Sequence, residues 1–123
     1  MNVVDSSAWL EYFADGPNAA FFSASIESTE DLLVPSVCLY EVFKRILQQR
    51  GEHEALEAVA VMAEGSIVNL DMQLALEAAR FSLDHGLPMA DSIILATARA
   101  HDAILWTQDA HFVGLDGVQY RAK

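Results

Sequence analysis

Basic residues are scarce in this sequence. Lys and Arg together number 7, against 18 Asp and Glu, and the formal net charge is −11. Because such a surface repels phosphates, binding of nucleic acid by bulk charge is excluded. A nuclease that uses metal ions and a local basic patch stays open, and the excess of acids also favours a basic protein partner.

Cysteine and long apolar runs are also nearly absent. Cys38 is the single cysteine, so no internal disulfide can form, which fits a reducing cytoplasm. No apolar run approaches the ~18 residues of a membrane-spanning helix, and no basic segment precedes an apolar one near the start of the chain. We therefore expect a cytoplasmic protein with no secretory signal and no membrane partner.

The hydrophobic content is nevertheless sufficient for a sizeable core. Hydrophobic residues make up 53% of the 123 residues, which argues against disorder. The sequence shows no internal repeat, low-complexity tract or linker. Because this length suits one compact domain, we expect residues 1–123 to fold as a single domain.

Short apolar runs alternate with longer amphipathic segments. The apolar runs predict strands at residues 2–5, 32–34, 66–70 and 103–106, with a short fifth strand at 118–120. Helical spacing and turn residues predict helices at 6–14, from 18 onward, and at 37–50, 52–64, 72–85 and 88–102. The predicted N-caps are Ser6 or Ser7, Ser36 and Asp71. Apolar strands joined by helices indicate an α/β fold whose parallel sheet is covered on both faces.

Acidic residues occur where the predicted strands end. Asp5 ends the first strand and Asp109 lies just beyond the fourth, so both should reach the carboxyl edge of the sheet, where open parallel sheets bind ligands. Asp91 shares a helix face with apolar residues, and Glu41 borders an apolar and a basic face of another helix. Each acid alone is ordinary as a surface residue or a cap; Asp91 on its apolar face fits that interpretation least.

Carboxylates gathered at one edge of a sheet favour a metal site. They would repel one another and raise the pKa of at least one member, and a divalent cation relieves that repulsion. Mg²⁺ and Mn²⁺ prefer carboxylate oxygens and water, and such a site can activate water and stabilise a phosphodiester transition state. Ser6 and Thr107 are candidates to hold waters or orient the carboxylates.

Four short strings occur in a characteristic order: VDSSA at 4–8, YEV at 40–42, ADSIILA at 90–96 and LWTQDAHF at 105–112. Together they resemble the PIN-domain family, and the small size resembles the VapC-type toxins of bacterial toxin–antitoxin pairs. The resemblance implies a three-layer α/β/α fold with a central parallel sheet of four to five short strands. It also implies a Mg²⁺- or Mn²⁺-dependent endoribonuclease, a homodimer and inhibition by a small antitoxin protein.

The resemblance also implies which residues form the site. The catalytic, metal-binding acids would be Asp5, Glu41, Asp91 and Asp109. Thr107 matches the family's hydroxyl two residues before the last acid. Some members carry a further acid shortly after the last one, whereas Ala110 and His111 follow here. The number of metal ions, one or two, therefore stays open. The histidines show no metal-ligand spacing, and the pattern assigns His111 no catalytic role.

Two further features concern partners. Lys44, Arg45 and Arg50 lie on the helix of Glu41 and are candidates for contacts to RNA phosphates, or else form a solvated helix face. The first two helices carry too many aromatic residues for all to be buried: Trp9, Tyr12, Phe13, Phe21 and Phe22. This predicts a hydrophobic groove for an antitoxin on the N-terminal helices, extended by Ala58, Val61 and Met62.

Other functions compete with the nuclease. A receiver domain has this length and an acidic pocket, but it needs an Asp at the end of the third strand and a Lys after the fifth. Asn69 and Leu70 stand at the first position, and lysine occurs only at Lys44 and Lys123. An Asp-x-Asp phosphatase motif is disfavoured because Ser7 stands two residues after Asp5. A catalytically silent PIN-like or receiver-like regulatory domain that only binds a partner stays an alternative.

Overall fold

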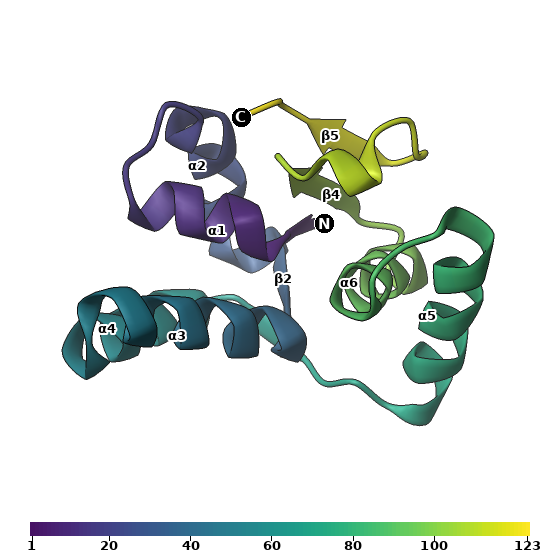
Figure 1. Cartoon of the computed structure of the whole chain (residues 1–123), viewed down its shortest axis with the longest axis horizontal. Helices are drawn as coiled ribbons and strands as arrows, with labels where there is room; N and C mark the ends of the chain where they lie inside the picture. Colours follow the sequence, from purple (N-terminus) through teal and green to yellow (C-terminus); the bar gives the residue numbers. More distant parts are fainter.

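The computed structural model describes residues 1–123 and contains a five-stranded parallel sheet between helices (Figure 1). The strands are β1 (Asn2–Val4), β2 (Leu32–Pro35), β3 (Ser66–Val68), β4 (Ile104–Thr107) and β5 (Val118–Tyr120). Their order is β3-β2-β1-β4-β5, and every neighbouring pair is parallel. The predicted α/β class with a parallel sheet is therefore confirmed.

The helices cover both faces of this sheet. They are α1 (Ser6–Phe13), α2 (Ala19–Glu27), α3 (Ser36–Arg50), α4 (Glu52–Met62), α5 (Met72–His85) and α6 (Met89–Ala100). Figure 1 shows α1 to α4 on one side of the sheet and α5 with α6 on the other. From β1 the chain adds β2 and then β3 toward one edge of the sheet. Helices α5 and α6 then lead it back to the other side of β1, where β4 is added. With right-handed crossovers this change of direction places the two groups of helices on opposite faces, which gives the expected three layers.

Most predicted elements are present, with altered ends. The first strand ends at Val4, the third at Val68, and the fourth includes Thr107. The third strand is short because its ladder with β2 ends where Pro35 pairs with Val68. Two short 3₁₀ helices, at Thr29–Asp31 and Ala110–Phe112, were not predicted.

The prediction of the first helix cap was wrong. Asp5, rather than Ser6 or Ser7, is the N-cap of α1, and its side chain accepts a 3.1 Å hydrogen bond from the backbone N–H of Ala8. The backbone N–H of Asp5 donates to the Trp106 carbonyl at 3.0 Å, which holds this residue in the sheet while the helix starts at Ser6. An acid that caps α1 from the end of β1 therefore has a fixed position.

The other predicted helix caps are Ser36 for α3 and Asp71 for α5. Ser36 is the first residue of α3, and the cap position is Pro35, which makes no side-chain hydrogen bond, so the Ser36 prediction was also wrong. Asp71 caps α5 as predicted, accepting from the backbone N–H of Leu74 at 2.8 Å.

The core lies on both faces of the central strands. Val3, Val4 and Val34 are completely buried, and α6 is buried continuously from Ser92 to Ala98. Cys38 lies in this core and not at the surface, and burial raises the pKa of its thiol far above the usual range. None of the helices combines the length and apolar character that crossing a bilayer requires. The tight packing of β1 and α6 gives the acids at their ends a rigid support.

Candidate active site

The direction in which the chain adds successive strands to the sheet reverses between β1 and β4. These two strands lie side by side although about a hundred residues separate them in sequence. In open parallel sheets the crevice outside the carboxyl ends of two such strands is the usual ligand site. Asp5 follows β1 directly, and Asp109 follows β4 after one intervening residue. The strand order therefore brings the first and last acids of the predicted set to one crevice.

Asp5 is the most deeply buried of these acids, with 2% of its surface exposed. The Ser7 hydroxyl donates to both of its carboxylate oxygens, at 2.8 Å and 3.1 Å. Burial raises the pKa of Asp5 to about 7, the hydrogen bonds from Ser7 and Ala8 oppose that rise, and the charge of Asp109 adds to it. The carboxylate form of Asp5 is therefore costly unless a cation lies nearby.

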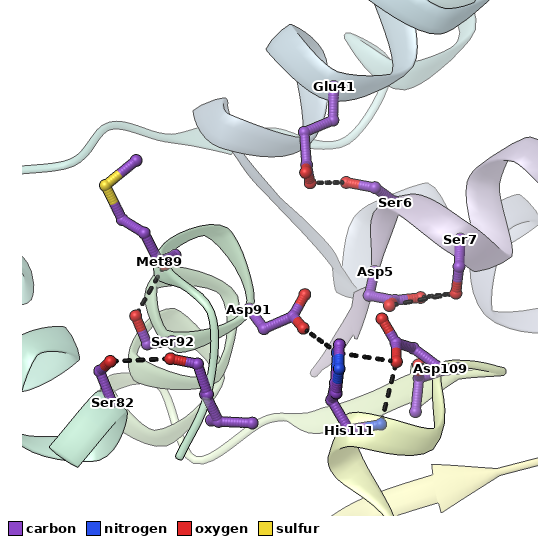
Figure 2. Close-up of polar contacts among 12 residues, drawn as sticks. Asp5, Ser6, Ser7, Glu41, Ser82, Met89, Asp91, Ser92, Asp109 and His111 are labelled. Carbon is purple, nitrogen blue, oxygen red and sulfur yellow. Dashed lines mark hydrogen bonds and ion pairs between the residues drawn. The ribbon is translucent and has the colours of Figure 1, made fainter. Parts of the chain in front are cut away.

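Asp91 and Asp109 meet at a shared histidine (Figure 2). The Nδ1 atom of His111 lies 2.8 Å from Asp91 Oδ2 and 3.1 Å from Asp109 Oδ1. One ligand atom from each of the three residues fits within 4.8 Å of the others. The Asp91 and Asp109 side chains are 13% and 28% exposed, while that of His111 is 55% exposed. This group is therefore open to solvent on the histidine side.

The charges in this group perturb one another. Burial raises the pKa of Asp91, and the neighbouring charge of Asp109 raises it further, while the hydrogen bond with His111 opposes both effects. The same hydrogen bond to Asp91, together with the negative charge of Asp109, raises the pKa of His111. The excess negative charge of the two acids thus stabilises a positive charge placed between them.

Glu41 approaches the crevice from α3. Its Oε1 atom accepts a 2.6 Å hydrogen bond from the Ser6 hydroxyl, and its charge contributes to the raised pKa of Asp91. Figure 2 shows Glu41 pointing down from α3 while Asp5, Asp91 and Asp109 point toward one another. All four predicted acids therefore face one crevice, but Glu41 and Asp5 lie outside the tight group that includes His111.

The two predicted hydroxyls lie against the acids. Ser6 is buried and holds Glu41. Thr107 is completely buried, and its Oγ1 accepts a 2.9 Å hydrogen bond from the backbone N–H of Asp109, while its hydroxyl also lowers the pKa of Asp5. Sequence reasoning missed the contacts of Ser7 and His111. The position of Ser7 two residues after Asp5 was an available signal, whereas nothing local indicated that His111 faces Asp91.

The predicted RNA-binding residues diverge in the structure. Lys44 places its Nζ 5.5 Å from the centroid of the Tyr40 ring, and Tyr40 is an exposed residue one position before Glu41. Arg50 forms an ion pair of 3.4 Å with Glu54. Arg45 and Arg50 line a groove between α3 and its neighbouring helices, and Lys44 does not line it.

This groove has a volume of about 820 Å³ and runs between α1, α3 and α4. Its apolar lining residues are Leu10, Phe13, Ala14, Ile46, Ala58 and Val61. The predicted groove on the first two helices differs from it, because Trp9, Phe22 and Met62 are completely buried in the core and α2 contributes no lining residue. The groove extends to Ser7 and Gln108, which are neighbours in sequence of the acids.

The fold and the crevice together define a parallel α/β protein with a carboxylate site at its topological switch point. The chain belongs to the PIN domain family, whose model matches residues 3–118. No curated protein sequence matches the chain.

Several solved structures share the fold. A toxin–antitoxin complex from Klebsiella pneumoniae has a chain with a TM-score of 0.80 and 21% identity, covering 97% of this chain and 96% of that chain. VapC20 of Mycobacterium tuberculosis, described as a toxin that cleaves the sarcin–ricin loop, has a TM-score of 0.70 and 15% identity over 84% of this chain and 85% of that chain. VapBC2 of Rickettsia felis, bound to a DNA fragment from its promoter, has a TM-score of 0.74 and 10% identity, covering 98% of this chain and 97% of that chain.

Proposed function

We propose that this PIN-domain chain is a metal-dependent endoribonuclease that acts as the toxin of a toxin–antitoxin pair and hydrolyses RNA phosphodiester bonds. The observation that carries the proposal is the convergence of Asp5, Asp91 and Asp109 at the switch point of the sheet. Two solved structures of the same fold support it: one is described as a toxin–antitoxin complex, and the other as a toxin that cleaves the sarcin–ricin loop. Residues 1–123 would act as one domain.

The donor set fits a hard divalent cation. Burial raises the pKa of Asp5 and of Asp91; no cationic side chain opposes the rise at Asp5, and His111 offsets it only in part at Asp91. Carboxylate oxygens are the preferred ligands of Mg²⁺ and Mn²⁺. Asp5, Glu41, Asp91 and Asp109 would hold the ion. When bound, it would supply charge stabilisation at the phosphodiester and lower the pKa of a water molecule.

The neighbouring hydroxyls preorganise these acids. Ser7 holds the Asp5 carboxylate, Ser6 holds Glu41, and Thr107 fixes the backbone of Asp109. Because each of these hydrogen bonds exists before substrate arrives, the carboxylates need not reorganise when the phosphate enters. These hydroxyls would act by positioning the acids and not by contacting the scissile bond.

RNA must approach a protein whose formal net charge is −11. We propose that Lys44, Arg45 and Arg50 supply local positive charge for its phosphates. Lys44 and Arg45 follow Glu41 by three and four positions on α3, so they lie on the same side of the helix as that acid. The exposed ring of Tyr40 next to Lys44 adds a surface on which a base could stack.

A small antitoxin would occupy the groove between α1, α3 and α4. The groove is lined by six apolar residues together with polar and charged residues of both signs, including Arg45 and Glu57. This composition suits an amphipathic segment with basic side chains, which the net charge of the protein also attracts. An occupant would lie next to Ser7 and Gln108, close enough to the acids to hinder RNA.

A homodimer is the remaining partner prediction. Exposed large apolar residues occur around the start of α5 and the start of α6: Leu70, Met72, Leu76 and Met89. A separate apolar hollow of about 340 Å³ lies between the same helices. A second copy covering this face would remove it from water.

The deciding experiment is an RNA cleavage assay with Mg²⁺ or Mn²⁺. The wild type is expected to cleave, whereas Asp5→Asn, which keeps the shape and loses the charge, is expected to be inactive. Asp84→Asn, an exposed acid on α5, is the matched control and should cleave as well as the wild type. Equal cleavage by Asp5→Asn would refute the assignment, and no cleavage by any variant would favour a PIN-like domain that only binds a partner.

A further inference from the structure

His111 stands between two of the acids although its sequence pattern gave it no role. A single ring atom, Nδ1, makes both contacts, at 2.8 Å to Asp91 and 3.1 Å to Asp109. Figure 2 shows the His111 ring between the carboxylates of Asp91 and Asp109. A nitrogen donor therefore adjoins a site whose other donors are all oxygens.

The spacing of these atoms matches the spacing of metal ligands. Two metal–ligand bonds of about 2.1 Å at a right angle separate their donor atoms by about 3.0 Å. The distances from His111 Nδ1 to the oxygens of Asp91 and Asp109 bracket this value. The two carboxylate oxygens also lie within 4.8 Å of each other, so one nitrogen and two oxygens are close enough together to bind one ion.

The backbone holds the ring in this place. The backbone N–H of His111 donates to Asp109 Oδ1 at 2.9 Å, so Asp109 is the N-cap of the short 3₁₀ helix Ala110–Phe112. The next side chain, Phe112, is completely buried and anchors that helix in the core. Because the ring itself remains half exposed, an ion can enter from solvent without any opening of the fold.

We propose that His111 is a nitrogen ligand of the divalent cation held by Asp91 and Asp109. Imidazole suits Mn²⁺, Co²⁺, Ni²⁺ and Zn²⁺ far better than Mg²⁺, which prefers oxygen ligands. His111 therefore shifts the preference of the site away from Mg²⁺ and toward transition metals. The inference rests on the proposed metal site but not on cleavage of RNA.

The same contacts would also suit a role for His111 that opposes metal binding, and the experiment must distinguish the two roles. A protonated His111 could act as a built-in cation that occupies the space between Asp91 and Asp109 and competes with metal. In that case loss of the ring would strengthen the binding of every divalent cation. A ligand role predicts the reverse, with the largest loss for the metals that favour nitrogen.

The test is calorimetric titration of the full chain with Mg²⁺, Mn²⁺ and Co²⁺, comparing wild type with His111→Ala and His111→Asp. His111→Ala should weaken Co²⁺ binding by about 10-fold or more and Mg²⁺ binding by no more than about 3-fold. His111→Asp should bind Mg²⁺ more tightly than the wild type and lose the preference for Co²⁺. His53→Ala, at an exposed histidine paired with Glu57, is the control and should change neither affinity.

A spectroscopic measurement gives an independent result. Bound Mn²⁺ should show magnetic coupling to a nitrogen nucleus in wild type and His53→Ala, and this coupling should vanish in His111→Ala. Unchanged coupling in His111→Ala, or tighter binding of all three metals by that variant, would overturn the proposal. If no variant cleaves RNA but these metal preferences are found, the nuclease proposal fails and the ligand role of His111 stands.

Discussion

The Ser6 hydroxyl donates a 2.6 Å hydrogen bond to Oε1 of Glu41. This bond joins the first turn of α1 to α3, two helices that otherwise follow different strands. It aims an acid from the third helix at a crevice formed by β1 and β4. The position of Glu41 therefore depends on Ser6, one of the two hydroxyls named from the sequence as candidates to orient the carboxylates.

Replacing Ser6 by Ala tests this contact. Loss of one hydrogen bond at a buried position should lower the free energy of unfolding by about 1 kcal/mol. The rate of RNA cleavage should fall by about 10-fold, because Glu41 is present but no longer held in position. Glu41→Ala, which removes the carboxylate, should lower the rate further. Steady-state cleavage rates and urea unfolding measure the two effects. Cleavage by Ser6→Ala at the wild-type rate would mean that the bond does not position the acid.

Asp5 should make the metal-free protein less stable as pH rises. Burial raises its pKa from the ordinary 3.8 to about 7 in the folded protein, so it is protonated in both the folded and the unfolded state below pH 3.8. Above that pH the unfolded chain loses this proton first, and the stability contributed by the protonated form disappears as pH rises through 7. The shift corresponds to roughly 4 kcal/mol at most, and Asp91 acts in the same direction.

Denaturant unfolding in the presence of a metal chelator, at pH values from about 4 to about 8, measures this effect, because this range covers the ordinary and the folded-state pKa of Asp5. Asp5→Asn should show a smaller loss of stability with pH than the wild type, since its side chain does not titrate. The control Asp84→Asn should follow the wild type. Parallel curves for wild type and Asp5→Asn would contradict the raised pKa of Asp5.

Metal binding should stabilise the fold through the same acids. An ion at 100 times its dissociation constant adds about 2.7 kcal/mol to the free energy of unfolding. We expect Mn²⁺ to raise the melting temperature of the wild type, and Asp91→Asn to lose most of this rise together with RNA cleavage. Without metal, Asp91→Asn should be as stable as the wild type or more stable, because repulsion with Asp109 falls. Marked destabilisation without metal would identify Asp91 as a structural acid.

A large side chain in the groove between α1, α3 and α4 should weaken inhibition by the antitoxin without changing RNA cleavage. Ala14 is exposed at the end of α1 and lines the groove. Ala14→Arg places a large side chain there and should weaken antitoxin binding by roughly 30-fold, equivalent to about 2 kcal/mol. RNA cleavage by the isolated protein should stay unchanged, because the acids are untouched. Ala100→Arg, at the exposed end of α6, is the matched control.

Growth of cells that express the natural pair provides the readout. The antitoxin should protect cells from the wild type and from Ala100→Arg, but not from Ala14→Arg. Co-purification of the antitoxin should follow the same order. Full protection from Ala14→Arg would place the antitoxin elsewhere on the surface.

Local sequence was sufficient for most secondary structure. The run at Val118–Tyr120 has the bounds predicted for it, and Asp71 caps α5 as expected. Both depend on neighbouring residues: Val118 and Tyr120 alternate with the polar Gln119, and the Asp71 side chain reaches the backbone of its own helix. Where Asp5, Ser6 and Ser7 stand together, each able to cap, local reasoning chose wrongly. The hydrogen bond from the Asp5 backbone to Trp106 of β4 keeps Asp5 in extended conformation, so that Asp5 and not a serine is the N-cap.

The sequence alone also indicated which acids belong at the ends of strands, because buried apolar runs and the polar residues that follow them are visible in one dimension. It could not place β1 beside β4, and that pairing brings Asp5 near Asp109. Nor could it direct the His111 ring toward Asp91, twenty positions earlier in the chain. Such contacts depend on strand order and on how buried residues such as Phe112 orient the backbone, so only the tertiary structure decided them.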